Sequence, residues 1–182
     1  RLSPRFARRE LALQRASKAL EEFIAAAAPA KDPQGLSRGL LITLGLKQSD
    51  AARWITAAAL EEELARLESE MGFLTPELKA AINACPVEPA TRAAYLRRGE
   101  GFEKSLEKMK GNAEESLRLL ETDEWRAAVK TVEAAQAENT ALRKDLSRNI
   151  HDFVLTPASL LSLYAPQPRW RRMLEDAVAQ YL

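Results

Sequence analysis

The sequence predicts an all-α protein, a multi-helix bundle built round a long antiparallel helical hairpin over residues 102–154. Apolar residues recur at steps of three and four along several long segments, which is the period of an amphipathic helix. The sequence has no useful length of period-two alternation and no Asn-Gly or Asp-Gly pair, the usual signals of strands and hairpin turns. Pairs of a hydroxyl residue and a proline, at Ser3-Pro4, Thr75-Pro76 and Thr156-Pro157, mark helix starts.

The first predicted helix runs from Pro4 to about Ala28, with Ser3 as its N-cap. We expect its apolar side to face the core, and the residues on that side are Phe6, Leu13, Leu20, Phe23, Ile24 and Ala27. Prolines and a glycine then predict a loop. The leucine-rich stretch 36–44 is interpreted as a short, largely buried helix, with a strand as the alternative.

The next predicted helix spans Asp50 to Met71, capped by Ser49 and closed by Gly72. Its core side is predicted to contain Trp54, Ile55, Ala58, Leu60, Leu64, Leu67 and Met71. Its acidic residues are expected mainly on the solvated side, namely Glu61, Glu62, Glu63, Glu68 and Glu70.

A short helix from Thr75 to about Ala84 ends at the Cys85–Pro89 stretch, the best internal boundary in the sequence. We therefore divide the chain into an N-terminal helical segment, 1–86, and a segment 87–182 with the hairpin and short C-terminal helices; together they are expected to form one compact domain. A helix at 91–98 is expected to be interrupted by Gly99 and Gly101. An amphipathic helix over 102–121 follows, with an apolar side of Phe102, Leu106, Met109, Ala113, Leu117 and Leu120.

The stretch 123–154 predicts a long helix with a coiled-coil-like seam, formed by Trp125, Ala128, Val132, Ala135, Asn139, Leu142, Leu146, Asn149 and Phe153. A polar Asn139 in such a seam is typical of register control in a dimer, so a homodimer through this seam is one interpretation. The small alanines favour the other, close packing within the chain. Short helices are predicted after it, at 156–164 and 169–182.

Composition restricts the class of protein. The chain has 182 residues, of which 46% are hydrophobic and 29% charged, and a net charge of +1, so its bulk charge predicts neither nucleic-acid nor membrane binding. No apolar run approaches the roughly 20 residues of a transmembrane helix. The chain starts at Arg1 instead of Met, which suggests a processed product. Its arginine-rich start is typical either of an ordinary basic helix or of an organellar transit peptide.

Residues with catalytic potential do not form a recognisable motif. His151 is the only histidine, without the Glu-x-x-His spacing of di-iron bundles, and Cys85 is the only cysteine. Cys85 follows a helix C-terminus, where a thiol pKa is raised instead of lowered. The acidic clusters sit at consecutive helical positions, so their carboxylates fan outward. We therefore predict a protein that is not an enzyme and holds no cofactor or metal.

The most interaction-like residues are basic and aromatic ones near the two ends, Arg5, Arg8, Arg9, Arg169, Trp170, Arg171 and Arg172. Tryptophan and arginine are enriched at the centres of protein interfaces. The sequence thus predicts a structural or adaptor subunit that binds other protein subunits. The alternative is a nucleic-acid-binding module that uses the basic termini.

Residues 114–150 contain a hairpin with a family resemblance. The stretch LRLLETDEWRAAV, followed by LRKDLSRNI, resembles the first helical hairpin of PsbQ-type extrinsic proteins of photosystem II. The matching positions are Trp125, Leu142, Arg143, Asp145, Leu146 and Ile150. The family normally has two further long helices, where this chain has a proline-broken tail. The resemblance implies a processed, non-catalytic subunit of the thylakoid lumen that stabilises a pigment-protein membrane complex.

Overall fold

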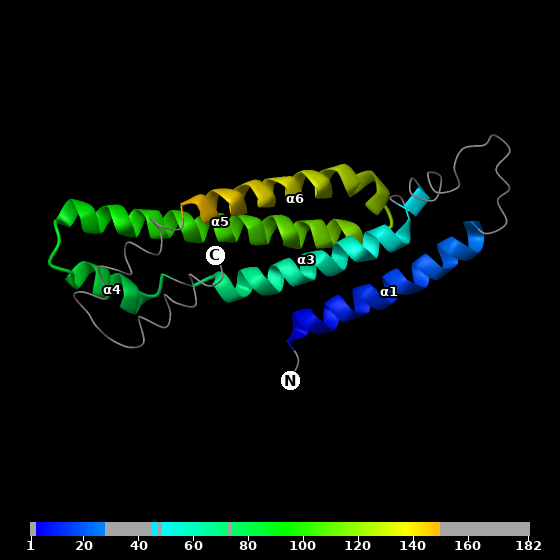
Figure 1. The fold of residues 1–182 in the computed structure, drawn as a ribbon, viewed down its shortest axis with the longest axis horizontal. Coiled ribbons are helices and arrows are strands. Elements are labelled where there is room, and N and C mark those ends of the chain that lie inside the picture. Colours follow the sequence, from blue (N-terminus) through cyan, green and yellow to red (C-terminus); the bar gives the residue numbers. More distant parts are fainter. Residues whose placement is uncertain (1–2, 28–44, 47–48, 73, 150–182) are drawn as a thin grey trace. The chain divides into compact units, whose positions relative to one another are not determined.

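The described part of the protein is all-α. A computed structural model describes residues 3–27, 45–46, 49–72 and 74–149 (Figure 1). Within them lie five helices, α1 (Pro4–Ala27), α3 (Asp50–Glu70), α4 (Pro76–Ala84), α5 (Pro89–Glu121) and α6 (Trp125–Arg148), and no strand. The predicted helical fold class is therefore confirmed. The predicted helices at 36–44, 156–164 and 169–182, and the end of the central helix after residue 149, lie outside the described residues.

The helices begin and end where the capping residues predict. The Ser3 hydroxyl accepts a hydrogen bond from Phe6 N at 3.3 Å, and the Thr75 hydroxyl accepts one from Leu78 N at 3.2 Å. Ser49 Oγ is 3.4 Å from Ala52 N at the start of α3. After α3 the chain turns at Gly72, whose φ of 81° lies in the left-handed region that glycine adopts without strain.

Helix α5 corrects one prediction. It is continuous from Pro89 to Glu121, 33 residues long, so the interruption predicted at Gly99 and Gly101 is wrong. A glycine inside a helix costs only about 1 kcal/mol, and the buried apolar face on either side outweighs that cost. Gly99 also packs closely, because a Cβ built on it would lie 3.0 Å from Leu74 Cδ1.

The chain forms two compact units, and α3, α5 and α6 each contribute residues to both. Unit 1 consists of Arg1–Arg66 and Ala113–Ala135, and unit 2 of Leu67–Asn112 and Gln136–Leu182. The core of unit 1 contains Ala12, Ala57, Ala58, Leu60, Leu64, Ala113, Leu120, Trp125 and Val132. The core of unit 2 contains Leu67, Phe102, Leu106, Met109 and Leu146, with Met71 and Leu142 packed against it.

The predicted core sides of α5 and α6 are the sides that the two units bury. In unit 2 the Asn139 side chain is buried and donates to the Met109 carbonyl at 3.0 Å, and it accepts from Asn112 Nδ2 at 2.9 Å. The Asn139 amide is thus hydrogen-bonded within its own chain. Packing within the chain is the alternative that the sequence favoured over a dimer. The single hairpin over 102–154 stays a prediction. So does the division into segments 1–86 and 87–182, and the two units divide the chain at other positions.

Candidate interaction surface on α1

The buried side of α1 is made of small residues. Ala12 and Ala16 are each 6% exposed, and Ala12 belongs to the same core as Ala57 and Ala58 of α3. Alanines on facing helices allow the two backbones to approach closely. The side of α1 that faces the core of unit 1 is therefore set by methyl groups and not by its large apolar residues.

Two arginines fix the start of α1 to acidic side chains. Arg5 Nη1 lies 3.1 Å from Glu61 Oε2, and Arg5 Nη2 lies 3.5 Å from Glu114 Oε1. Arg9 Nε lies 3.2 Å from Glu62 Oε2. Glu61 is only 6% exposed, so its expected place on a solvated side is wrong; the arginine provides the partner that a buried carboxylate needs.

An alternating ladder of arginine and tryptophan side chains continues this attachment. Arg15 lies over the Trp54 ring at 4.6 Å, and Arg53 lies 4.5 Å from the centroid of the same ring. Arg53 is also 5.6 Å from the centroid of the Trp125 ring, and Arg126 lies 4.7 Å from that same centroid. Cation–π contacts of this kind contribute about 0.5–2 kcal/mol each. The ladder therefore joins α1, α3 and α6 within unit 1.

Arg53 has a second role in the ladder, because its guanidinium donates to the Leu120 and Thr122 carbonyls at the end of α5. The Leu120 carbonyl lies in the last turn of α5, where carbonyls lack a partner inside the helix, so Arg53 caps α5. The Thr122 carbonyl follows the helix and also accepts from Trp125 N at 3.3 Å. Sequence reasoning missed the ladder. The sequence does place Arg53 beside Trp54 and Trp125 beside Arg126. Neighbours in sequence, however, do not reveal which arginine and tryptophan side chains meet between helices.

The side of α1 next to the buried one carries an exposed apolar row. Phe6 is 42% exposed, and the other members are Leu13 at 37%, Leu20 at 37% and Ile24 at 57%. We call these four residues the α1 stripe. The prediction that they face the core is wrong. Alanine contacts and the Arg5, Arg9 and Arg15 attachments rotate α1 so that the large apolar residues lie beside, and not in, the contact with α3.

The sequence-predicted partner residues have different surroundings. Arg5 and Arg9 are partly buried and paired as described, and Arg8 is exposed on α1. The other predicted partner residues lie outside the described residues, namely Arg169, Trp170, Arg171 and Arg172. His151 lies outside them as well. The partner-binding role of the whole set stays a prediction.

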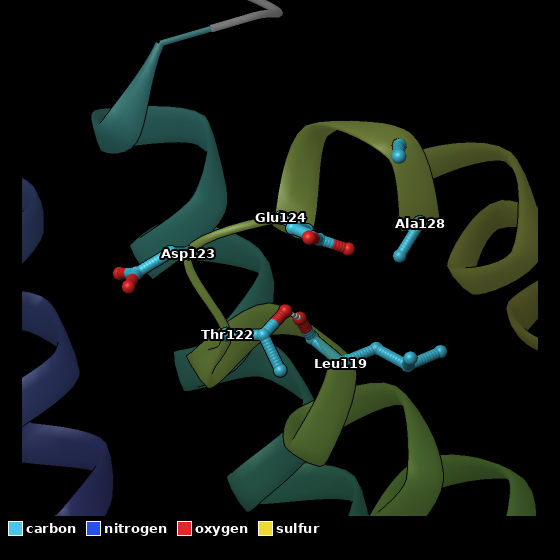
Figure 2. Close-up of a pocket in the computed structure, with 6 residues that line it drawn as sticks. Leu119, Thr122, Asp123, Glu124 and Ala128 are labelled. Atoms are coloured by element: carbon cyan, nitrogen blue, oxygen red, sulfur yellow. Dashed lines mark hydrogen bonds between the residues drawn. The ribbon is translucent and has the colours of Figure 1, made fainter.

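A hollow of about 580 Å³ lies at the corner between α5 and α6, lined by Leu119, Thr122, Asp123, Glu124, Ala127 and Ala128. Figure 2 draws the side chains that line it. The Thr122 hydroxyl donates to the Leu119 carbonyl at 2.8 Å, which commits it to closing the turn. The Asp123 carboxylate points away from Glu124, so these two acids do not form a pair. The hollow offers small apolar contacts and no paired acid and base.

Cys85 is buried at the end of α4. Burial raises the pKa of its thiol, and the nearby Arg92 guanidinium opposes that rise. Arg92 itself donates to the Cys85 carbonyl at 3.0 Å. The raised pKa keeps the thiol protonated near neutral pH, which is the direction of shift that the sequence predicted.

Buried and bridging polar groups of unit 2 connect helices to one another. Arg143 Nη1 contacts both carboxylate oxygens of Glu70, at 3.1 and 2.9 Å, and the Glu70 side chain is 1% exposed. Glu70 was expected to be solvated, so that expectation is also wrong. Glu138 accepts from Lys108 and Asn112, and these hydrogen bonds lower the pKa of its carboxyl.

None of the described helices is long and apolar enough to cross a membrane. Within the same residues, no three or more His, Cys, Asp or Glu side chains gather where a metal ion could be held. Comparison of the chain with models of known protein families, with curated proteins and with solved structures found no match.

Proposed function

We propose that the protein is a non-catalytic structural or adaptor subunit that docks on a larger protein assembly through its helical faces. The observation that carries the proposal is the α1 stripe, four large apolar side chains in a row on a helix whose other side is already attached to its own unit. An amphipathic helix presenting anchors at steps of three, four or seven is a common form of helix recognition. Contiguous apolar surface on a folded protein is typical of an interaction site.

The polar contacts support a non-catalytic role. General acid–base and nucleophilic catalysis need side chains that converge on a space that a substrate can enter. In the part of the chain that the structure describes, Arg5, Arg53, Asn139 and Arg143 are all engaged between helices. These residues contribute to packing geometry and leave the α1 stripe as the most distinctive exposed surface.

The resemblance to PsbQ-type proteins gives this proposal a specific form, an extrinsic subunit of a photosynthetic membrane complex in the thylakoid lumen. Two of the similar positions, Leu146 and Arg143, belong to the interior contacts of unit 2. The resemblance therefore concerns the residues that build a hairpin, and the docking surface is proposed from α1. A nucleic-acid-binding role receives less support, because Arg5 and Arg9 already contact glutamates.

The test is recovery of native complexes. A tagged chain is isolated from the cells that produce it, with crosslinking and mass spectrometry of the bound proteins. We expect other subunits to be recovered, and to be lost when Leu13→Glu and Leu20→Glu place two charges on the α1 stripe. The matched control, Gln14→Glu with Ala25→Glu, adds the same charge at exposed positions off the stripe and should retain them. A chain recovered alone from gentle extracts would contradict the proposal.

A further inference from the structure

Helix α1 is attached to unit 1 with little apolar burial. Among residues 4–26, only Ala12 and Ala16 are buried, and Phe23 is the one large apolar residue that is half-buried. Helix α3, in contrast, buries Leu60 and Leu64 completely in the same unit. Burial of apolar area is the main favourable contribution to packing, and a methyl group offers far less area than a leucine side chain. The apolar contact that holds α1 is therefore weaker than the one that holds α3.

The ion pairs of α1 do not make up for this small apolar burial. Glu62 and Glu114, which contact Arg9 and Arg5, are exposed, and exposed pairs contribute little because water solvates the separated charges well. The pair of Arg5 and Glu61 is buried. Its attraction is largely offset by the removal of both charges from water, and departure of the helix returns both charges to water together. The ion pairs thus fix the position of α1 and add little to the free energy that keeps it there.

The charges of α1 also make it a poor helix once it leaves α3. Its first turn contains no acidic residue and its last turn no basic one. Without their glutamate partners, Arg5 and Arg9 would face the positive end of the helix dipole uncompensated. A helix without tertiary packing is marginal in water. Departure of α1 from α3 therefore lets the amide hydrogens of the whole helix exchange with solvent.

We propose that α1 is a strap that opens from α3 as one element while α3, α5 and α6 stay folded. Local opening of this kind occurs in elements with few buried apolar contacts. The face of α3 that opening uncovers contains Trp54, Ala57, Ala58 and Glu61. The strap therefore controls the access of solvent to an apolar and acidic face of α3. The inference does not rest on the proposed function, because opening needs no partner on the α1 stripe.

Hydrogen exchange of the purified full chain, followed by mass spectrometry of its peptides, tests the strap. We expect amides in the middle of α1, residues 10–20, to be protected at least about tenfold less than those of residues 57–64 in α3. Low concentrations of urea should change the exchange of α1 far less than that of α3, because local opening exposes less surface than unfolding of the unit. Equal protection or equal urea dependence would overturn the inference, since α1 would then open only when unit 1 unfolds.

The attachment of α1 to α3 should set how often the strap opens. Arg5→Gln with Arg9→Gln leaves Glu61 buried without its arginine, so exchange in the middle of α1 should be at least about tenfold faster. The matched control, Arg8→Gln with Lys18→Gln, removes the same charge from exposed positions of α1 and should change the rate less than about threefold. Equal acceleration by both double variants contradicts the proposal, because the charge of the helix and not its attachment would then set the opening.

The alanine contact provides a second, independent variant. Ala12→Leu places a larger side chain in the core that Ala12 shares with Ala57 and Ala58, and such overpacking should speed the exchange of α1 at least about fivefold. Ala7→Leu, the same substitution at an exposed position, is the control and should leave the rate unchanged. Protection of α3 should persist in every variant. Loss of that protection together with that of α1 would show that the two helices unfold as one, which overturns the strap, and so would an unchanged rate in Ala12→Leu.

Discussion

At the scale of single residues, the Glu70–Arg143 pair is the contact most sensitive to mutation. The Glu70 side chain is 1% exposed and the Arg143 side chain 18% exposed. Glu70→Ala leaves a cation without its partner, and we expect it to lower the free energy of unfolding by about 3–5 kcal/mol. Glu70→Leu combined with Arg143→Met removes both charges, so it should lower the free energy of unfolding much less than Glu70→Ala.

Urea unfolding of Glu70→Leu, of Arg143→Met and of the double variant that combines them measures the coupling between Glu70 and Arg143. Lys108→Ala is the control, since it breaks an exposed ion pair with Glu138 and should lower the free energy of unfolding far less than Glu70→Ala. Additive effects of the Glu70 and Arg143 substitutions would contradict a coupled buried pair.

Cys85 gives the protein a pH dependence on the alkaline side. Its folded pKa is raised above the ordinary value of 9.0, chiefly because burial disfavours the thiolate. Between the unfolded and folded pKa values the folded chain therefore holds more protons than the unfolded one, so stability falls as the pH rises. The contribution is fully present below about pH 9 and is lost as the pH rises through the folded pKa.

Urea midpoints of the wild type and of Cys85→Ala at pH 8 and pH 10 isolate this effect. We expect the wild-type midpoint to fall more steeply between the two values, because the alanine variant lacks the thiol and keeps every other titrating group. Parallel decreases in the two proteins would show that Cys85 contributes nothing to the pH dependence.

At the scale of elements, the glycines inside α5 and the glycine in the turn after α3 occupy two different kinds of position. A Cβ at Gly101 or Gly111 would meet nothing within 4 Å, so each substitution by alanine should raise the free energy of unfolding by about 0.4–1 kcal/mol. Gly72→Ala should lower it, because the φ of 81° is strained for alanine. Thermal unfolding of the three variants measures both signs. Destabilisation by Gly111→Ala would mean that α5 needs a glycine there.

The elements also show how far sequence reasoning reaches. The caps at Ser3, Ser49 and Thr75 were predictable because a capping side chain bonds to a residue two or three positions away. The core faces of α5 and α6 followed from their long apolar periods. The orientation of α1 did not, because it depends on Glu61 and Trp54, which are distant in sequence. A helix with alanines on one side and large apolar residues on the next has two candidate core faces, and only its neighbours decide between them.

At the scale of the whole molecule, the two units should unfold together. Helices α3, α5 and α6 each pass from one unit into the other, so loss of unit 2 would leave unit 1 with three truncated helices. Helices are cooperative, and short ones are marginal without tertiary packing. A defect in the core of unit 2 should therefore lower the melting temperature that unit 1 reports.

Leu106→Ala tests this cooperativity. Leu106 is fully buried in the core of unit 2, so the substitution should cost about 2–5 kcal/mol. In a Trp170→Phe background, the remaining tryptophans, Trp54 and Trp125, belong to unit 1. We expect their fluorescence transition to fall by about 5–15 °C and to coincide with the circular dichroism transition. Leu64→Ala, in the core of unit 1, provides the reference shift. A fluorescence transition that Leu106→Ala leaves in place would show that the two units unfold independently in spite of their shared helices.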